Sequence, residues 1–232
     1  MNVPLLRRLS AELVGSALLA ALVIGSGIAA QNLSPSDPGL QLLENAIATA
    51  LGLPVLILLF APLSGAHFNP VVSLVDSLSG GRAWRETLAY IPVQVIGCVL
   101  GAILANLMFS AAPVSVSDTD RLTPAHFFAE IVATAGLVLV IFVLARTGRS
   151  SATPAAVGAY IGAAYFFTSS SSFANPAITV GRMFSDTFAG IAPSSAPGFI
   201  VAQLLGAAIG FGLLRWFYPA GAKNAPIRDS GR

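Results

Sequence analysis

The chain has 232 residues, of which 55% are hydrophobic and 9% are charged, with a formal net charge of +2. This composition excludes an ordinary soluble domain and favours an integral membrane protein, whose length suits one domain. The sequence has no nucleotide-binding loop, no metal-ligand cluster and no nucleophile with a base at useful spacing. We therefore expect no enzyme, no metal or other cofactor and no nucleic-acid partner.

Six apolar segments are long enough to cross a bilayer, because about 20 helical residues span its hydrocarbon core. They lie at about residues 11–30, 42–61, 87–109, 127–145, 152–168 and 198–217. The first could be mistaken for a secretory signal, but it contains Glu12 and matches a later segment that carries Glu130. We interpret it as a membrane span that the mature protein keeps.

Two segments between these spans share a second pattern. Residues 64–76 and 170–182 each place a small, polar run before an Asn-Pro pair and about two turns of apolar residues. Asn is a favourable N-cap and Pro fits the first helical position, so helices should begin at Asn69-Pro70 and Asn175-Pro176. About 8 to 10 residues cover only half of the hydrocarbon thickness. The sequence therefore predicts two half-helices.

The same landmarks recur in both halves of the chain, in the same order. Each half has a glutamate in its first span, then an Asn-Pro pair, then a Gln followed three residues later by Gly; these are Glu12, Asn69, Gln94 and Gly97, and Glu130, Asn175, Gln203 and Gly206. Three spans per half force the second half to enter from the opposite side. We predict one channel domain, residues 1–232, built of inverted repeats at about 8–110 and 125–218.

The distribution of basic residues predicts the orientation. With both termini cytoplasmic, ten of the twelve Lys and Arg residues fall inside, namely Arg7, Arg8, Arg82, Arg85, Arg146, Arg149, Arg215, Lys223, Arg228 and Arg232. Only Arg121 and Arg182 fall outside, which agrees with the positive-inside rule.

The two half-helices predict a pore. Their N-terminal ends carry partial positive charge and would meet near the midplane, where Asn69 and Asn175 would face each other. Irregular backbone at this depth is tolerated only where it lines a cavity. A narrow pore with a positive centre repels protons and other cations and passes small neutral molecules that form hydrogen bonds.

Together these motifs resemble the aquaporin, or major intrinsic protein, family along almost the whole chain. The residues that carry the resemblance are Ala11-Glu12, Ser64-Gly65-Ala66-His67-Phe68-Asn69-Pro70-Val71, Gln94 with Gly97, Ala129-Glu130, Asn175-Pro176-Ala177, and Gln203 with Gly206. The resemblance implies an all-α membrane protein with six transmembrane helices and two re-entrant half-helices, assembled as a homotetramer with one pore per subunit. It also implies that Glu12 and Glu130 anchor the re-entrant loops by accepting backbone hydrogen bonds. Gln at either position would keep an acceptor of nearly the same shape.

The chain departs from the family pattern at two places. Val71 replaces Ala in the first Asn-Pro-Ala motif, adding two methyl groups beside the midplane constriction, which we expect to be tolerated. Ile178 stands where the family almost always has an Arg in its selectivity filter. Counted without gaps from the two Asn residues, the other filter positions are Thr49, Ala163 and Ser172. A wide, uncharged constriction is similar to that of bacterial aquaglyceroporins associated with arsenic resistance.

Two further residues have alternative interpretations. Arg182 lies one turn beyond Ile178, and an exposed ion pair with Asp186 at helical spacing is favoured over a displaced filter cation in the outer vestibule. His67 should line or support the inner pore mouth, and a pH gate is the less favoured alternative.

The predicted function is a passive channel for small neutral solutes, namely glycerol-like polyols, neutral metalloid hydroxides such as arsenous acid, and water. The alternative is a proton-coupled secondary transporter in which Glu12 and Glu130 handle protons. A membrane-junction protein with little conduction is a third candidate. We expect a multi-pass protein of the bacterial inner membrane, with lipid and the solute as its partners.

Overall fold

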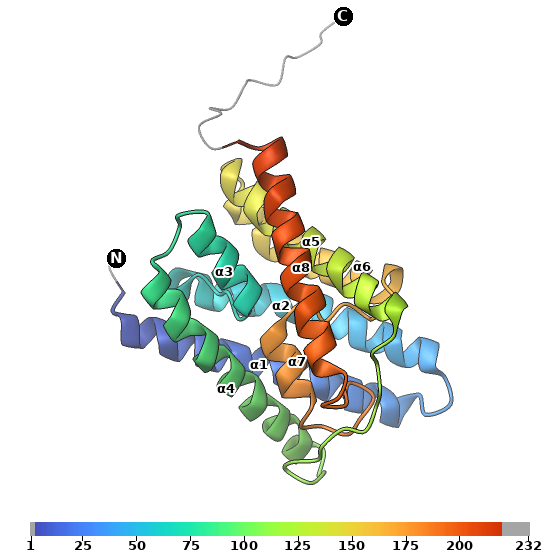
Figure 1. Cartoon of the computed structure of the whole chain (residues 1–232). Helices are drawn as coiled ribbons and strands as arrows, with labels where there is room; N and C mark the ends of the chain where they lie inside the picture. Colours follow the sequence, from blue (N-terminus) through green and yellow to red (C-terminus); the bar gives the residue numbers. More distant parts are fainter. Residues whose placement is uncertain (1–2, 220–232) are drawn as a thin grey trace, which may run out of the picture.

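The computed structural model describes residues 3–219, and this part of the chain is helical throughout its regular structure (Figure 1). The helices are α1 (Leu5–Leu33), α2 (Pro38–Ser64), α3 (Pro70–Leu78), α4 (Trp84–Met108), α5 (Pro124–Arg146), the 3-10 turn η1 (Ser150–Ala152), α6 (Thr153–Phe167), α7 (Pro176–Arg182) and α8 (Ala196–Phe217). The predicted arrangement of six spans and two half-helices is confirmed.

Five of the six spans are longer than the apolar segments of the sequence predict. These five, α1, α2, α4, α5 and α8, are each long and apolar enough to cross a membrane. The fifth span along the chain, α6, has 15 residues, is slightly shorter than its predicted segment 152–168, and follows η1 directly. Helices extend beyond the apolar runs because capping residues decide where they begin. Asp37 caps α2 by accepting from the amide of Leu40 at 2.9 Å, and Thr123 caps α5 by accepting from the amide of His126 at 3.1 Å.

The two halves use the same packing. Helix α1 packs most extensively on α4, and α5 packs on α8 in the same way. Each crossing is close because two glycines face the partner backbone: a Cβ at Gly97 or Gly101 would collide with a carbonyl of α1, and one at Gly206 or Gly210 with a carbonyl of α5. This small-xxx-small spacing lets transmembrane helices approach closely.

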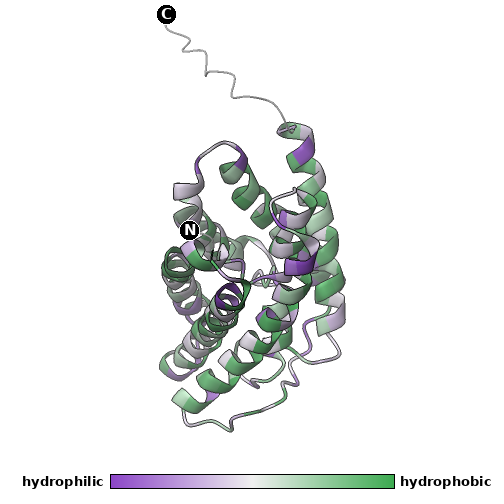
Figure 2. Ribbon diagram, turned by 90° about the vertical axis from the view of Figure 1, so that its left-hand side faces the viewer, coloured by the Kyte–Doolittle hydropathy of each residue, from purple (hydrophilic) through white to green (hydrophobic). Residues whose placement is uncertain are grey.

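The half-helices α3 and α7 lie in the middle of the bundle. Figure 1 shows them between the crossed pair α1 and α4 and the crossed pair α5 and α8. Helix α3 contacts α4 and α8, and α7 contacts α8 and α4, so each half-helix is held by both halves of the chain. Hydrophobic residues dominate the long helices in Figure 2.

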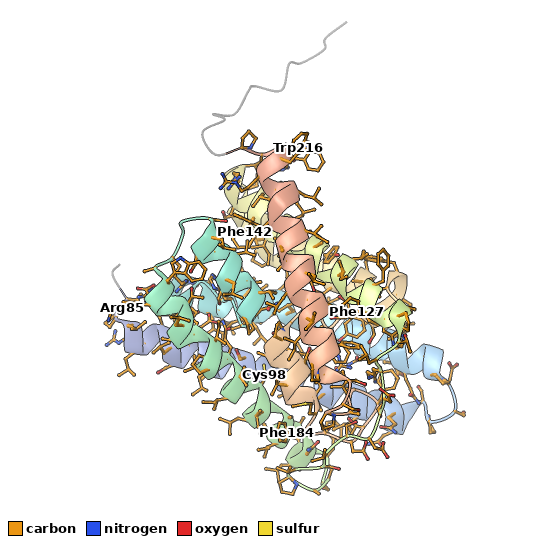
Figure 3. The ribbon with its side chains drawn as sticks, in the orientation of Figure 1. Arg85, Cys98, Phe127, Phe142, Phe184 and Trp216 are labelled. Carbon is orange, nitrogen blue, oxygen red and sulfur yellow. The ribbon has the colours of Figure 1, made fainter. Side chains whose placement is uncertain are left out.

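Polar contacts identify the two ends of the bundle. At one end Arg8 of α1 forms a bidentate ion pair with Glu86 of α4, at 2.5 and 2.8 Å, and Arg146 of α5 donates to the carbonyl of Tyr218 after α8. Arg85 and Trp216 mark this end in Figure 3. At the other end Asn106 of α4 donates to the carbonyl of Phe184 after α7. The predicted inner basic residues that the structure describes lie at the first end. Lys223, Arg228 and Arg232 lie outside the described residues.

Candidate functional site

A cavity of about 250 Å³ lies between the two halves of the bundle. One wall is apolar and comes from the spans, with Leu19, Val23, Leu53, Ile57, Leu137, Ile141, Val157 and Ile161 in the lining. The other wall is the backbone of the two loops that precede the half-helices, residues 65–69 and 172–175. A solute in this cavity therefore meets hydrocarbon on one side and peptide groups on the other.

The two asparagines meet in this cavity and are bonded across the repeat. Each caps its half-helix: the Oδ1 of Asn69 accepts from the amide of Val71 at 3.1 Å, and the Oδ1 of Asn175 accepts from the amide of Ala177 at 2.9 Å. Their Nδ2 atoms donate at 2.8 Å to the opposite loop, Asn69 to Ala174 and Asn175 to Phe68. An amide nitrogen carries two hydrogens, so each Asn keeps one donor for a solute.

The loops before the two Asn residues have matching, unusual backbone conformations. Ala66 and Phe68 have φ values of 51° and 50°, and their counterparts Ser172 and Ala174 have 50° and 47°. Left-handed conformations in residues other than glycine each cost on the order of 1–3 kcal/mol, so surrounding contacts must hold them.

These conformations leave carbonyl groups free along the cavity. Within residues 3–219 no protein group donates to the carbonyls of residues 65–67 or to those of residues 171–173. Each loop thus offers three consecutive acceptors before its Asn. Two short acceptor ladders, joined by the two Asn donors, can replace the hydration of a small hydroxyl-bearing solute.

Glu12 holds the first loop. Its Oε1 accepts from Ser64 Oγ at 2.6 Å and from the amide of His67 at 3.0 Å. Its Oε2 accepts from the amide of Phe68 at 2.7 Å and from Gln94 Nε2 at 2.8 Å. The carboxylate is fully buried, and four donors converge on its two oxygens.

Glu130 holds the second loop in the same way. Its Oε1 accepts from Ser170 Oγ at 2.6 Å and from the amide of Phe173 at 2.9 Å. Its Oε2 accepts from the amide of Ala174 at 2.9 Å and from Gln203 Nε2 at 2.7 Å. Glu130 is fully buried, and four donors converge on its two oxygens as they do on those of Glu12. The repeated Glu and Gln residues of the sequence are therefore the supports of the repeated loops.

The remaining residues of the two Asn-Pro motifs lie away from the cavity. Pro70 and Pro176 begin the half-helices. Val71 is fully buried and packs in a cluster with residues of α5 and α8, and Ala177 is fully buried as well. Our expectation that Val71 stands beside the constriction is therefore wrong: the first residue to face the cavity from α3 is Val72.

Thr49, Tyr165, Ser172 and Ile178 line the cavity together, and three of them carry a hydroxyl group. The hydroxyls of Thr49 and Tyr165 are 3.2 Å apart, and Ser172 Oγ is buried without a hydrogen-bond partner among the described residues. Ile178 contributes a neutral, branched side chain. This set of residues, the proposed outer constriction, offers hydroxyl groups but no charge at the position of Ile178.

Ala163 does not belong to this constriction, which corrects the sequence prediction. It is exposed on the outer face of α6, whereas Tyr165 of the same helix is buried and lines the cavity. Residues that are two positions apart in a helix point in directions about 200° apart. An error of two positions in the count therefore selects a residue on the opposite face of α6. The ungapped count carried the family's spacing over to this chain, and that spacing does not hold between α6 and Asn175, where residues 168–174 intervene. Tyr160 and Tyr165 are the two tyrosines of this span, and no signal in the sequence separated the one that lines the cavity from the other.

Arg182 is buried, which overturns the favoured expectation of an exposed pair with Asp186. Only 3% of Arg182 is exposed, and its guanidinium lies 3.5 Å from the centroid of the Phe173 ring. Helix α7 ends at Arg182, so the helical spacing to Asp186 does not exist. Asp186 instead accepts from the amide of Asp118. Arg182 lines the outer end of the cavity.

His67 lies at the inner end of the cavity within a polar cluster. Its Nδ1 is 2.9 Å from Ser73 Oγ, and its Nε2 is 3.5 Å from Asp76 Oδ2. The same Asp76 oxygen lies 3.3 Å from Arg82 Nε, and Arg82 also donates to the carbonyl of Ser64 at 2.9 Å. The sequence pattern did not identify Asp76, which contacts His67, or Arg82, which contacts Asp76. The cluster fixes the imidazole beside the inner mouth.

Comparison with known proteins gives consistent matches. A family model described as major intrinsic protein matches residues 1–174. The chain is similar to the aquaglyceroporin AqpS of Rhizobium meliloti (strain 1021), with 49% identity over 212 residues that cover 91% of this chain and 90% of the relative. Aquaporin Z of Brucella melitensis is 30% identical to this chain over 224 residues, which cover 89% of this chain and 95% of the relative. The X-ray structure of the aquaglyceroporin from Plasmodium falciparum has the same fold, with a TM-score of 0.66 at 23% identity, covering 91% of this chain and 96% of that one.

Proposed function

Because the chain belongs to the major intrinsic protein family, we propose that it is a passive membrane channel for glycerol and other small neutral solutes. The observation that carries this proposal is the cavity between the half-helices. Residues 65–67, 172 and 173, whose carbonyls accept no hydrogen bond from the described residues, line this cavity with Asn69 and Asn175, opposite an apolar wall. Such a lining replaces the water around hydroxyl groups, whereas the positive ends of two half-helices repel cations.

The constriction supports a broader solute range than water alone. Ile178 leaves the outer narrow section without a fixed cation, and the Thr49, Tyr165 and Ser172 hydroxyls donate or accept as the solute requires. Neutral metalloid hydroxides such as arsenous acid carry hydroxyl groups in a compact shape similar to that of glycerol. We include them, glycerol-like polyols and water among the solutes that pass.

The proposed assembly is a homotetramer in the bacterial inner membrane, with both termini in the cytoplasm. Support comes from the apolar residues exposed on the long helices and from the concentration of basic residues at the end where α1 begins. Lipid and neighbouring subunits would cover the apolar faces, and the basic end would face the cytoplasm.

The test is solute flux in proteoliposomes. Vesicles with purified protein are shrunk osmotically, and their re-swelling is followed with glycerol, urea or arsenite outside, against protein-free vesicles. Flux should rise in proportion to the gradient and should not saturate at moderate concentrations. Saturation together with accumulation against a gradient under an imposed pH difference would instead establish a proton-coupled transporter. Absence of any protein-dependent flux would support a junction protein.

A further inference from the structure

Two arginines at the outer mouth converge on one aromatic ring. The guanidinium of Arg182, at the end of α7, lies 3.5 Å from the centroid of Phe173, and that of Arg121, from the segment between α4 and α5, lies 5.7 Å from it. Phe173 packs against Phe199 of α8 at 5.0 Å between centroids. The ring therefore holds two cations from distant parts of the sequence close together.

Both guanidinium groups are held by neutral carbonyls. Arg121 donates through Nε to Gly190 at 2.6 Å and through Nη2 to Phe188 at 2.7 Å, and Arg182 donates through Nε to Ala189. These three carbonyls fix the orientation of the two side chains but do not neutralise their charge. Burial lowers the pKa of Arg121 below its usual value, which shows that its charge is poorly solvated.

Neither arginine forms an ion pair with a carboxylate of residues 3–219. The nearby carboxylates have other partners: Asp120 accepts from Ser195 Oγ, and Asp186 accepts from the amide of Asp118. Within the same range, Nη1 of Arg121 and both terminal nitrogens of Arg182 donate no hydrogen bond. The pair therefore retains two charges and three unpaired donor nitrogens.

These groups border a cavity that continues from the pore. A second cavity, of about 360 Å³, is lined by both arginines together with Tyr165, Ser169 and other residues of the outer mouth. Tyr165 and Arg182 line the pore cavity as well, so the two cavities adjoin at these side chains. A molecule bound between the arginines would stand at the entrance of the proposed solute path.

We infer that this outer vestibule binds a small oxyanion, such as inorganic phosphate, between Arg121 and Arg182, and that the bound anion obstructs solute entry. Both guanidinium groups lie against the same ring and line the same cavity, and an anion that contacts both relieves the repulsion between their like charges. Guanidinium groups match the oxygens of phosphate with several parallel donors, which favours an oxyanion over a spherical ion such as chloride. Binding is independent of the proposed function, whereas obstruction rests on it.

Binding is measured by titration calorimetry of the detergent-purified full chain with inorganic phosphate, against sodium chloride at equal ionic strength. Phosphate should bind saturably and chloride should not. Arg182→Gln and Arg121→Gln should each weaken phosphate binding roughly tenfold or more, because each removes a charged donor. Arg149→Gln is the matched control, since Arg149 is exposed at the opposite end of the bundle and its loss should leave binding unchanged.

Arg182→Lys and Arg121→Lys cover the case in which a Gln variant fails to fold. They keep the charge but lose the planar fork, so they should bind phosphate more weakly than the wild type and better than the Gln variants. Phosphate binding that is absent, that chloride reproduces, or that survives in every variant overturns the site.

Obstruction is measured as glycerol flux into proteoliposomes with phosphate or chloride outside at equal ionic strength. Phosphate should slow the wild type and the Arg149→Gln control but should have less effect on Arg182→Gln. Saturable phosphate binding without any effect on glycerol flux would overturn the obstruction. Absence of glycerol flux in every vesicle would count against the channel, while calorimetry would still decide whether the anion site exists.

Discussion

Ile178 is the apolar residue of the proposed outer constriction. Its side chain is buried at the cavity wall and can neither donate a hydrogen bond nor carry a charge. The hydroxyls of Thr49 and Tyr165 and the unpartnered Oγ of Ser172 are therefore the polar side-chain groups that a solute meets there. Arg182, one turn further out, meets the solute first.

We predict that Ile178→Arg changes selectivity more than it changes water flow. The new guanidinium adds bulk and five donors to the narrow section, and it stands one turn from the Arg182 charge. Each 1.4 kcal/mol added to the barrier for permeation slows a solute about tenfold. The glycerol permeability of Ile178→Arg should fall at least about tenfold. The measurement is the ratio of glycerol to water permeability in matched proteoliposomes.

Ile178→Leu is the control, because it keeps an apolar side chain of the same volume. Its permeability ratio should equal that of the wild type. An unchanged ratio in a folded, conducting Ile178→Arg protein would mean that this residue is not at the constriction.

The buried carboxylates lead to a sharper prediction than the sequence allowed. Each oxygen of Glu130 accepts two hydrogen bonds, so Gln presents an NH₂ group to two donors and keeps only half of the acceptors. Gln has nearly the same shape as Glu, but it cannot accept from all four donors. Glu130→Gln should lower thermal stability by about 1–3 kcal/mol for each donor left unpaired, and Glu130→Ala by more.

Glu44→Gln provides the comparison for this series. Glu44 accepts a hydrogen bond only through Oε1, from Ser34 Oγ, among the described residues, so Gln can keep that bond. Thermal unfolding in detergent should show a loss for Glu130→Gln and little change for Glu44→Gln. Equal stability of the two variants would remove the anchoring role of Glu130.

At the scale of the elements, the helices and half-helices follow from the sequence, and two details do not. Asn-Pro pairs, apolar length and the repeated Glu and Gln residues define where the elements lie, because caps and bilayer thickness leave few alternatives. The direction in which a side chain points near a helix end does not follow from the sequence in this way. Tyr165 rather than Ala163 faces the pore because the spacing between α6 and Asn175 differs from the spacing that the ungapped count assumed, and Arg182 is buried because α7 ends there. Such details depend on tertiary contacts that a spacing rule does not contain.

The helix crossings predict an asymmetric response to adding a single methyl group. A Cβ at Gly206 would lie 2.5 Å from the carbonyl oxygen of Ile131, whereas one at Gly212 would have no atom within 4 Å. Gly206→Ala should therefore destabilise the α5 and α8 pair by about 1–3 kcal/mol through overpacking. Gly212→Ala should be neutral or slightly stabilising, because Ala favours a helix over Gly. Thermal unfolding compares the two, and equal midpoints would contradict the close crossing.

The half-helix caps predict the effect of removing one donor. In Asn175→Asp the side chain can still cap α7, but it can no longer donate to the carbonyl of Phe68, and a carboxylate would face that oxygen at about the same distance. We expect a severe loss of glycerol flux, of folded protein, or of both. Asn32→Asp, at an exposed position near the end of α1, adds the same charge without these contacts and should conduct normally. Normal yield and flux in Asn175→Asp would exclude the cap from the mechanism.

For the whole molecule, the single cysteine permits a direct test of the proposed orientation. Cys98 is fully buried within the bundle, so a membrane-impermeant maleimide should not label the wild type. Ser36→Cys places a thiol on an exposed position between α1 and α2, and Ser150→Cys places one between α5 and α6. With cytoplasmic termini, intact cells should label at position 36 only, and permeabilised cells at both. The opposite pattern would reverse the orientation.

The hydrogen bonds that cross between the two asparagine loops also bear on how the protein is made. The carbonyl of Phe68 receives its donor from a residue 107 positions later, and Asn69 donates to a carbonyl 105 positions later. During synthesis the first loop can already be held by Glu12 of its own half, but the carbonyl of Phe68 has no donor until most of the second half has followed it into the membrane. Neither half can form the bonds that join the two loops by itself. The permeation path therefore forms late and all at once, so an unfinished chain in the membrane holds no half-built pore through which solutes could leak.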